Sequence, residues 1–166
     1  RDIKATNVMV CHRAEIPDFV KVLDFGLVKM VDAGTTVTME GALTGTPLYM
    51  SPEAISTPDK IGPATDLYAL GIVGYYLLTG EYVFGEGTAM EICQQHATAT
   101  PQPPSARTER TISPDVDAVI LKCLAKKPED RPASARELAN LLAACASASR
   151  WSEDESLQWW QDEQKK

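Results

Sequence analysis

Two short runs rich in β-branched residues come first in the hydrophobic pattern of the chain. They are NVMVC at 7–11 and FVKVL at 19–23, separated by the polar segment HRAEIPD at 12–18. Two such runs around a polar, proline-containing segment predict a β-hairpin with a long loop. Residues 27–64 carry few apolar repeats and many Gly, Thr and Pro, which predicts an extended, mobile segment there.

Four helices are predicted after this segment. The first, from about Thr65 to Leu78, is apolar on nearly all sides, which places it at the centre of the core. Each of the other three begins with a recognisable N-terminal signal. These signals are Thr88 with Glu91, Ser113 with Pro114, and Ser134 with Glu137. The pattern therefore predicts a small hairpin followed by a helical body.

The composition changes from Ser147 onward to serine, acidic residues and all three tryptophans of the chain. Ser152 and Glu155 predict the cap of a short acidic helix whose apolar residues are Leu157, Trp159 and Trp160. Two interpretations stay open. The tail folds back on its own domain or frays, or its helix binds a partner, because exposed tryptophan seldom goes unused.

Length and charge limit the class of protein. The chain has 166 residues, of which 44% are hydrophobic, and this is enough for a core and excludes general disorder. A net charge of −7 argues against nucleic acid or an anionic membrane as the main partner. The longest apolar run, 67–78, is well short of the roughly 20 residues that span a bilayer.

The four cysteines lack the spacing of a zinc site or a disulfide framework. We interpret them as buried small apolar residues, which fits a reducing cytoplasm. His12 and His96 have no partner pattern and are interpreted as surface or packing residues.

Candidate chemistry begins with the heptapeptide RDIKATN. Asp2, Lys4 and Asn7 together could orient a hydroxyl, contact a phosphate and hold Mg²⁺, which prefers oxygen ligands. On its own, the same pattern also fits turn chemistry before a strand. Asp24, at the end of the second predicted strand, offers a second oxygen ligand, and Gly26 after it lets the backbone turn sharply.

Three further motifs follow in order: GTPLYMSPE at 45–53, DLYALG at 66–71 and KKPEDRP at 126–132. RDIKATN at 1–7 and DFG at 24–26 precede them. Together the five motifs resemble those of eukaryotic-type Ser/Thr protein kinases, in particular their bacterial branch. The family motifs are the H-R-D-x-K-x-x-N loop, D-F-G, the A-P-E region and the late arginine. The resemblance implies an α+β fold, a mainly α-helical C-lobe with a small β-hairpin. It divides the chain into a C-lobe at 1–146 and an acidic, Trp-containing tail at 147–166.

The resemblance also implies ATP-dependent phosphorylation of Ser/Thr hydroxyls on proteins, with ATP and Mg²⁺ as cofactors. Asp2 would be the catalytic base, and Lys4 would approach the γ-phosphate. Asn7 and Asp24 would hold Mg²⁺, and Met9 completes the implied nucleotide-binding set of Lys4, Asn7, Met9 and Asp24. The family parts that grip ATP, a glycine-rich loop, a strand lysine and a helix glutamate, come before the catalytic loop. We therefore expect this chain to be a fragment without the N-lobe and inactive alone, from an active parent kinase.

Further roles carried over from the family are structural or regulatory. Glu53 would form a buried ion pair with Arg131, and Asp66 would hydrogen-bond the backbone of the catalytic loop. Arg1 marks kinases that are activated by phosphorylation of the activation loop. Phe25, Gly26 and Thr46 complete the implied structural set, and Thr46 with Lys4 follows the Ser/Thr-specific pattern. The phosphorylation candidates are Thr38, then Thr36, Thr35 and Thr44, each of which is otherwise a plain loop residue.

Departures from the family pattern are mild. Ala5 stands where the family often has proline, and Ser51 replaces the alanine of A-P-E. The alternative to an enzyme is a pseudokinase or scaffold that binds proteins. Expected partners are a Ser/Thr-containing protein substrate and ATP, with a homodimer of the parent kinase as a candidate assembly. Membrane contact is expected only through segments outside this chain. Without the helix that precedes the catalytic loop in the family, one face of residues 67–78 would be partly uncovered.

Overall fold

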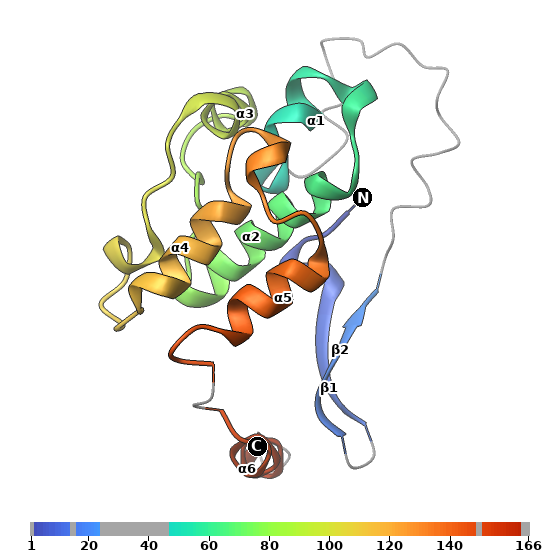
Figure 1. The fold of residues 1–166 in the computed structure, drawn as a ribbon, viewed down its shortest axis with the longest axis vertical. Helices are drawn as coiled ribbons and strands as arrows, with labels where there is room; N and C mark the ends of the chain where they lie inside the picture. The colour runs from blue at the N-terminus through green and yellow to red at the C-terminus, as the bar shows by residue number, and fades with distance from the viewer. Residues whose placement is uncertain (1, 14–15, 24–46, 149–150, 164–166) are drawn as a thin grey trace.

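The computed structural model describes residues 2–13, 16–23, 47–148 and 151–163, and the structural statements below concern these residues. Figure 1 shows a helical body on one side, a hairpin beside it, and a last helix near the far end of the hairpin. The strands are β1 (Val8–Arg13) and β2 (Ile16–Val22). The helices are α1 (Pro52–Ser56), α2 (Pro63–Thr79), α3 (Ala89–Thr98), α4 (Pro114–Cys123), α5 (Ala135–Ala143) and α6 (Glu153–Glu163). The predicted α+β class, mainly helical with a small hairpin, is confirmed.

Helix α2 forms the centre of the core, as its apolar sequence predicted (Figure 1). Tyr68, Ile72 and Tyr75 have no exposed surface. Pro63 occupies the first turn, where its missing N–H costs no hydrogen bond, and Gly80 ends the helix with a left-handed φ of 77°. These two residues account for a helix slightly longer than the apolar run.

The three helices with an N-terminal signal begin where the sequence predicted. The Glu91 amide donates to Thr88 Oγ1 at 3.3 Å, and the Thr88 amide donates to Glu91 Oε2 at 2.7 Å, which completes a capping box. The Glu137 amide donates to Ser134 Oγ at 3.1 Å. Helix α4 begins at Pro114 after Ser113, whose hydroxyl makes no capping bond. Caps act within one helical turn, so their residue types predict them well.

The prediction of a long hairpin loop is wrong. Pairing continues through the polar segment, with Cys11 opposite Phe19 and Arg13 opposite Ile16. Between these pairs β2 contains one more residue than β1, and Asp18 has a positive φ of 54°, as at a β-bulge. Pro17 is compatible with a strand because both strands of a two-stranded sheet are edges.

The prediction of an extended segment at 27–64 is wrong for its described part, which begins at residue 47. Two 3₁₀ turns, Pro47–Tyr49 and Pro58–Lys60, flank the short helix α1. Ser51 caps this helix by accepting from the Ala54 amide at 3.3 Å. Helical pieces this short contain no repeat of apolar positions, so hydrophobic periodicity does not reveal them.

Three of the four cysteines, Cys93, Cys123 and Cys145, are buried, and all four are free thiols. The interpretation as small core residues therefore holds for these three, while Cys11 on β1 is half-buried. Within the described ranges, no helix has the length and apolar character needed to cross a membrane.

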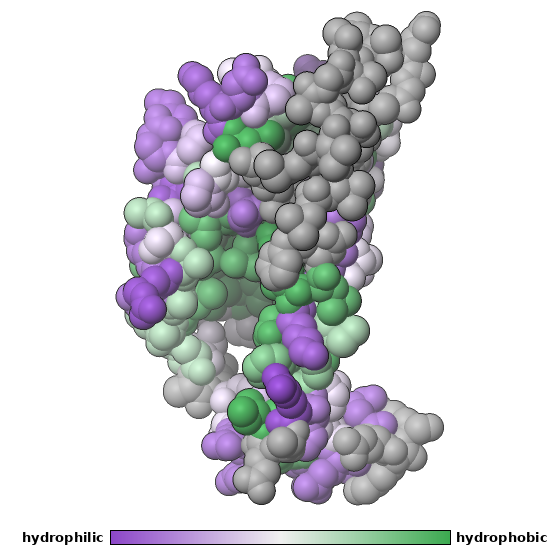
Figure 2. Space-filling view, turned by 90° about the vertical axis from the view of Figure 1, so that its right-hand side faces the viewer, coloured by the Kyte–Doolittle hydropathy of each residue, from purple (hydrophilic) through white to green (hydrophobic). Residues whose placement is uncertain are grey.

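Exposed hydrophobic residues lie on the hairpin and on one side of α2. In Figure 2 green surface follows the hairpin and continues into the recess beside the helical body. On α2, Leu70 and Leu77 are 39% and 68% exposed. They are seven residues apart and therefore share one helix face. This face of α2 is therefore partly exposed.

Candidate active site

Two polar side chains near the start of the chain, those of Lys4 and Asn7, lie around the carboxylate of Asp2. Lys4 Nζ lies 3.0 Å from Asp2 Oδ2. Asn7 donates from Nδ2 to the same oxygen at 3.1 Å and to the Asp2 backbone carbonyl at 2.9 Å. The side chains of Lys4 and Asp2 are 26% and 22% exposed, so the cluster is partly shielded but open to solvent. The structure thus brings together a carboxylate, a cation and an amide that the sequence had selected.

A tight turn explains this convergence. Residues Ala5–Asn7 form a 3₁₀ turn, closed by a 2.9 Å bond from the Asn7 amide to the Lys4 carbonyl. The hairpin starts directly after it, and the Leu23 amide donates to the Asn7 carbonyl at 2.8 Å. The hairpin therefore returns the chain to Asn7 one residue before Asp24, although Asp24 itself lies outside the described residues.

Tyr49 ties this turn to the helical body, and the sequence did not single it out. Its hydroxyl accepts a 3.3 Å hydrogen bond from the Ala5 amide. Its ring packs edge-on against Tyr82, with ring centroids 5.8 Å apart. Burial raises the pKa of Tyr49 to about 12, so the hydroxyl stays protonated at neutral pH. An aromatic residue inside the GTPLYMSPE motif was the only available signal, and it does not reveal a partner 44 positions away.

A buried ion pair joins Glu53 in α1 to Arg131, which follows the 3₁₀ turn Pro128–Asp130. The contact is bidentate, with Arg131 NH1 to Glu53 Oε1 and NH2 to Oε2 both at 2.8 Å. The side chains are 0% and 6% exposed for Arg131 and Glu53. Fork geometry of this kind is the strongest form of charge-assisted hydrogen bonding between side chains.

The remaining donors of Arg131 are also used. Nε donates to the Ala125 carbonyl, and NH1 and NH2 donate to the carbonyls of Ala64 and Lys126, at distances from 2.8 to 3.1 Å. The guanidinium also lies over the Tyr68 ring, 4.8 Å from its centroid. This one side chain therefore links α1, the start of α2 and the loop after α4.

The charged state of Glu53 is favoured inside this network. Burial raises the pKa of Glu53, but hydrogen bonds from Arg131 and from Thr65, whose hydroxyl lies at 2.8 Å, outweigh burial and bring the pKa to about 2. The Glu53 carboxyl is therefore ionised at neutral pH.

Other predicted site residues fall into two groups. Asp66 lies in the first turn of α2, and Met9 lies on β1, 46% exposed; their predicted contacts to the catalytic loop and to the nucleotide stay predictions. The second group lies outside the described residues: Arg1, Asp24, Phe25, Gly26, Thr35, Thr36, Thr38, Thr44 and Thr46. In the part of the chain that is described, no three His, Cys, Asp or Glu side chains form a metal cluster.

His96 is a core residue of α3. It has no exposed surface, and its Nδ1 lies 2.9 Å from the Tyr68 hydroxyl. Burial, with a smaller effect of Lys126, lowers the pKa of His96 to about 4, so the ring is neutral at pH 7. His12 stacks on Trp160 of α6, with centroids 6.0 Å apart. Both histidines pack against aromatic rings.

Comparison with known proteins gives one family. Residues 1–142 match the model described as "Protein kinase domain". Similar curated proteins include serine/threonine-protein kinase pkn3 of Myxococcus xanthus, 44% identical over 81% of this chain and 25% of the relative. Another is serine/threonine-protein kinase PknB of Mycobacterium tuberculosis, 42% identical over 83% of this chain and 21% of the relative. The chain thus spans about a fifth to a quarter of the length of these relatives.

Proposed function

The chain belongs to the protein kinase family, and from this premise we propose that the protein transfers the γ-phosphoryl group of ATP to serine and threonine hydroxyls of other proteins, in signalling. The relatives named above are serine/threonine-protein kinases, which supports this hydroxyl specificity. The observation that carries the proposal is the arrangement of Lys4 and Asn7 around the Asp2 carboxylate.

Each residue of this cluster has a role in the proposed transfer. The Asp2 carboxylate orients the substrate hydroxyl and accepts its proton. The ammonium group of Lys4, 3.0 Å from that carboxylate, is positioned to balance charge on the phosphoryl group. Phosphoryl transfer depends on positioning and electrostatic stabilisation, so one base and one cation held beside one tight turn suit it.

The residues also fit a magnesium ion bound with ATP. Asn7 Nδ2 is used in both bonds to Asp2, so Oδ1 is the atom of Asn7 that would bind the metal. Asp24 would supply a carboxylate oxygen, since the hairpin returns the chain to Asn7 at this point. When bound, Mg²⁺ would neutralise charge on the phosphate oxygens. Met9 would contact the nucleotide from β1.

Further parts of the proposal follow the family pattern. Arg1 would pair with a phosphorylated activation-loop threonine, first Thr38, and Asp66 would hold the catalytic loop. The printed sequence contains no glycine-rich G-x-G-x-x-G-x-V loop, so we propose that these 166 residues alone do not transfer phosphate. A cytoplasmic location and a kinase homodimer complete the proposal.

Replacing the base tests the function. In the longest natural form of the protein, Asp2→Asn should lower the rate of phosphate transfer from ATP to a protein substrate by about 10²- to 10⁴-fold, because general-base catalysis contributes that much. Asp59→Asn is the matched control, the same change at an exposed carboxylate in the turn after α1, and should leave the rate unchanged. Undiminished transfer by Asp2→Asn would refute the mechanism. Nucleotide and substrate binding without any transfer by the unsubstituted protein would favour the scaffold alternative.

A further inference from the structure

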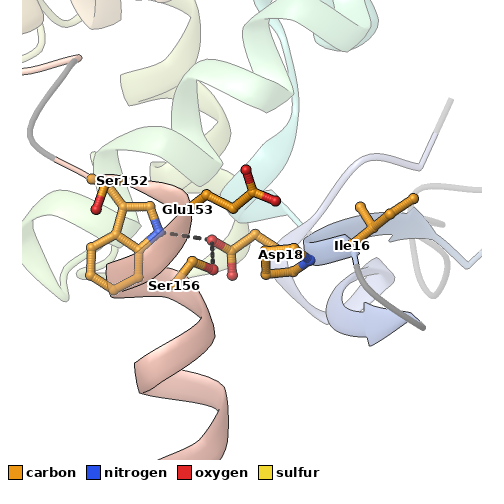
Figure 3. Close-up of a pocket in the computed structure, with 7 residues that line it drawn as sticks. Ile16, Asp18, Ser152, Glu153 and Ser156 are labelled. Atoms are coloured by element: carbon orange, nitrogen blue, oxygen red, sulfur yellow. Dashed lines mark hydrogen bonds between the residues drawn. The ribbon is translucent and has the colours of Figure 1, made fainter.

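Helix α6 contacts the hairpin through the carboxylate of Asp18. Trp151 Nε1 and Ser156 Oγ donate to Oδ2 at 2.7 and 2.5 Å, and Trp160 Nε1 donates to Oδ1 at 2.8 Å. Figure 3 shows Ser156 facing Asp18 across this contact. The three donors, Ser156 first, lower the pKa of Asp18 below its usual value. The tail is therefore held by one charged acceptor and three donors.

The bulge in β2 places Asp18 for this role. Asp18 has a φ of 54°, in the left-handed region, which aspartate tolerates better than most residues. On the neighbouring strand, the His12 ring stacks on Trp160. Both strands thus take part in holding α6.

The contact is largely polar, and the apolar side chains of α6 that are half-buried are Leu157 and Trp160, the latter stacked on His12. Trp151 and Trp159 remain 55% and 47% exposed. Ser156, 2% exposed, is the buried residue of α6. Segments held by few apolar contacts open and close at low free-energy cost. We therefore expect α6 to exchange between a docked and an undocked state.

The surroundings of Ser156 are acidic. Glu153, Asp154 and Glu155 form the first turn of α6, and Asp18 faces the Ser156 hydroxyl. The described residues that line the pocket at this contact include no lysine or arginine (Figure 3). A phosphate on Ser156 would remove the donated proton and add a charge of about −1.5 to −2 beside the Asp18 carboxylate.

We propose that Ser156 is a phosphorylation site and that a phosphate there releases α6 from the hairpin. Ser156 Oγ bonds to the γ-phosphorus of ATP, the bond from that phosphorus to the β–γ bridging oxygen breaks, and ADP leaves with the electron pair. The hydroxyl proton passes to a base of the kinase that performs the transfer. Any Ser/Thr kinase can supply this step, so the proposal does not depend on the activity of this chain. Because Ser156 is buried when docked, the phosphate is added in the undocked state and prevents return.

Release has a consequence for the candidate active site. β1 begins at Val8, directly after Asn7. A two-stranded hairpin is only marginally stable alone, so docking of α6 stabilises the strand pair that begins directly after Asn7. A phosphate on Ser156 would loosen that support from the far end of the hairpin.

The test uses phosphoserine incorporated at position 156 during translation, in the longest natural form of the protein. Hydrogen exchange of the β1 and β2 amides and tryptophan emission are compared with the unmodified protein. All three tryptophans lie in the tail, so emission reports its docking. We expect emission at longer wavelength and exchange more than tenfold faster, since losing one hydrogen bond to a charged group alone changes an equilibrium by about that factor and the phosphate adds repulsion from the Asp18 carboxylate.

Two controls separate charge from the mere loss of a bond. Phosphoserine at Ser105, which pairs with Asp117 in the helical body, adds the same charge elsewhere and should change neither readout. Ser156→Ala loses the same bond without adding charge and keeps the two tryptophan donors, so its exchange should rise less than that of the phosphorylated protein. Emission and exchange equal to those of the unmodified protein would overturn the proposal. Release by Ser156→Ala as complete as release by phosphate would also overturn it.

Discussion

Replacing Arg131 with methionine would remove all the hydrogen bonds of the buried guanidinium while keeping most of its volume. Glu53 would lose two bonds of 2.8 Å, and three backbone carbonyls would lose their donors. A carboxylate that is 6% exposed would then remain without its counter-ion. Breaking a buried pair in this way typically costs about 3–5 kcal/mol.

The charge state of Glu53 gives an independent value of similar size. Its pKa falls from 4.5 to about 2, and each unit corresponds to about 1.4 kcal/mol, or about 3 kcal/mol in total. Because the folded-state pKa is the lower one, this stabilisation is complete above about pH 4.5 and is lost as the pH falls toward 2. A domain with a free energy of unfolding of about 5–15 kcal/mol would lose a large fraction of it in Arg131→Met.

Urea unfolding at pH 7, followed by far-UV circular dichroism, measures this loss. Tryptophan fluorescence is unsuitable because all three tryptophans lie in the tail. Arg136→Met, at an exposed arginine of α5, is the matched control and should change stability little. The double variant Glu53→Met with Arg131→Met should recover a large part of the loss, since no unpaired charge remains. A loss below about 1 kcal/mol in Arg131→Met would refute this reasoning.

Two further predictions concern the core. Lowering the pH from 7 to 4 should reduce the free energy of unfolding, because folded His96 has a pKa of about 4 while the histidine of the unfolded chain binds a proton near pH 6.5. In urea titrations, His96→Gln should reduce this dependence of the free energy of unfolding on pH. An unchanged pH dependence would contradict the prediction. Gly71→Ala places a Cβ 2.6 Å from the Cys123 Cβ and should cost about 1–3 kcal/mol in thermal unfolding. In Gly74→Ala the new Cβ meets only the flexible Ile120 Cδ1, at 2.8 Å, so an equal loss there would argue against the clash.

Local signals in the sequence predicted most of the helical body. The Thr88 and Glu91 box acts within one helical turn, so residue types near that helix end determine it. Pro63 and Gly80 set the ends of α2 equally locally, although the expected range of about Thr65 to Leu78 did not use them. The same holds for the Ser152 cap of α6, whose hydroxyl accepts from the Glu155 amide at 3.2 Å.

Signals were absent where structure depends on pairing or on very short elements. The described residues of the polar segment, 12–13 and 16–18, continue the strands because backbone hydrogen bonds, which depend little on side-chain type, hold a ladder together. The short helix α1 has no apolar repeat, although Ser51, Pro52 and Glu53 are a cap, a first-turn proline and a first-turn acid. Those three residues were the signal that could have located it.

The candidate site shows the same division. The close spacing of Asp2, Lys4 and Asn7 in the sequence brings their side chains into contact, because a single turn joins them. The partner of Glu53 was expected only through the family resemblance, since Arg131 lies 78 positions away. Tyr49 was missed for the same reason.

The sequence by itself therefore determined the starts of the capped helices, the buried character of α2 and the polar cluster at the start of the chain, all of which depend on neighbouring residues. Only the tertiary structure decided that Asp18 of the hairpin accepts a hydrogen bond from Trp160, 142 positions later, and that Arg131 joins α1 to the loop after α4. Hydrogen bonds between distant residues form only after whole elements have packed. That packing depends on the shape and burial of many side chains at once, which no short stretch of sequence contains.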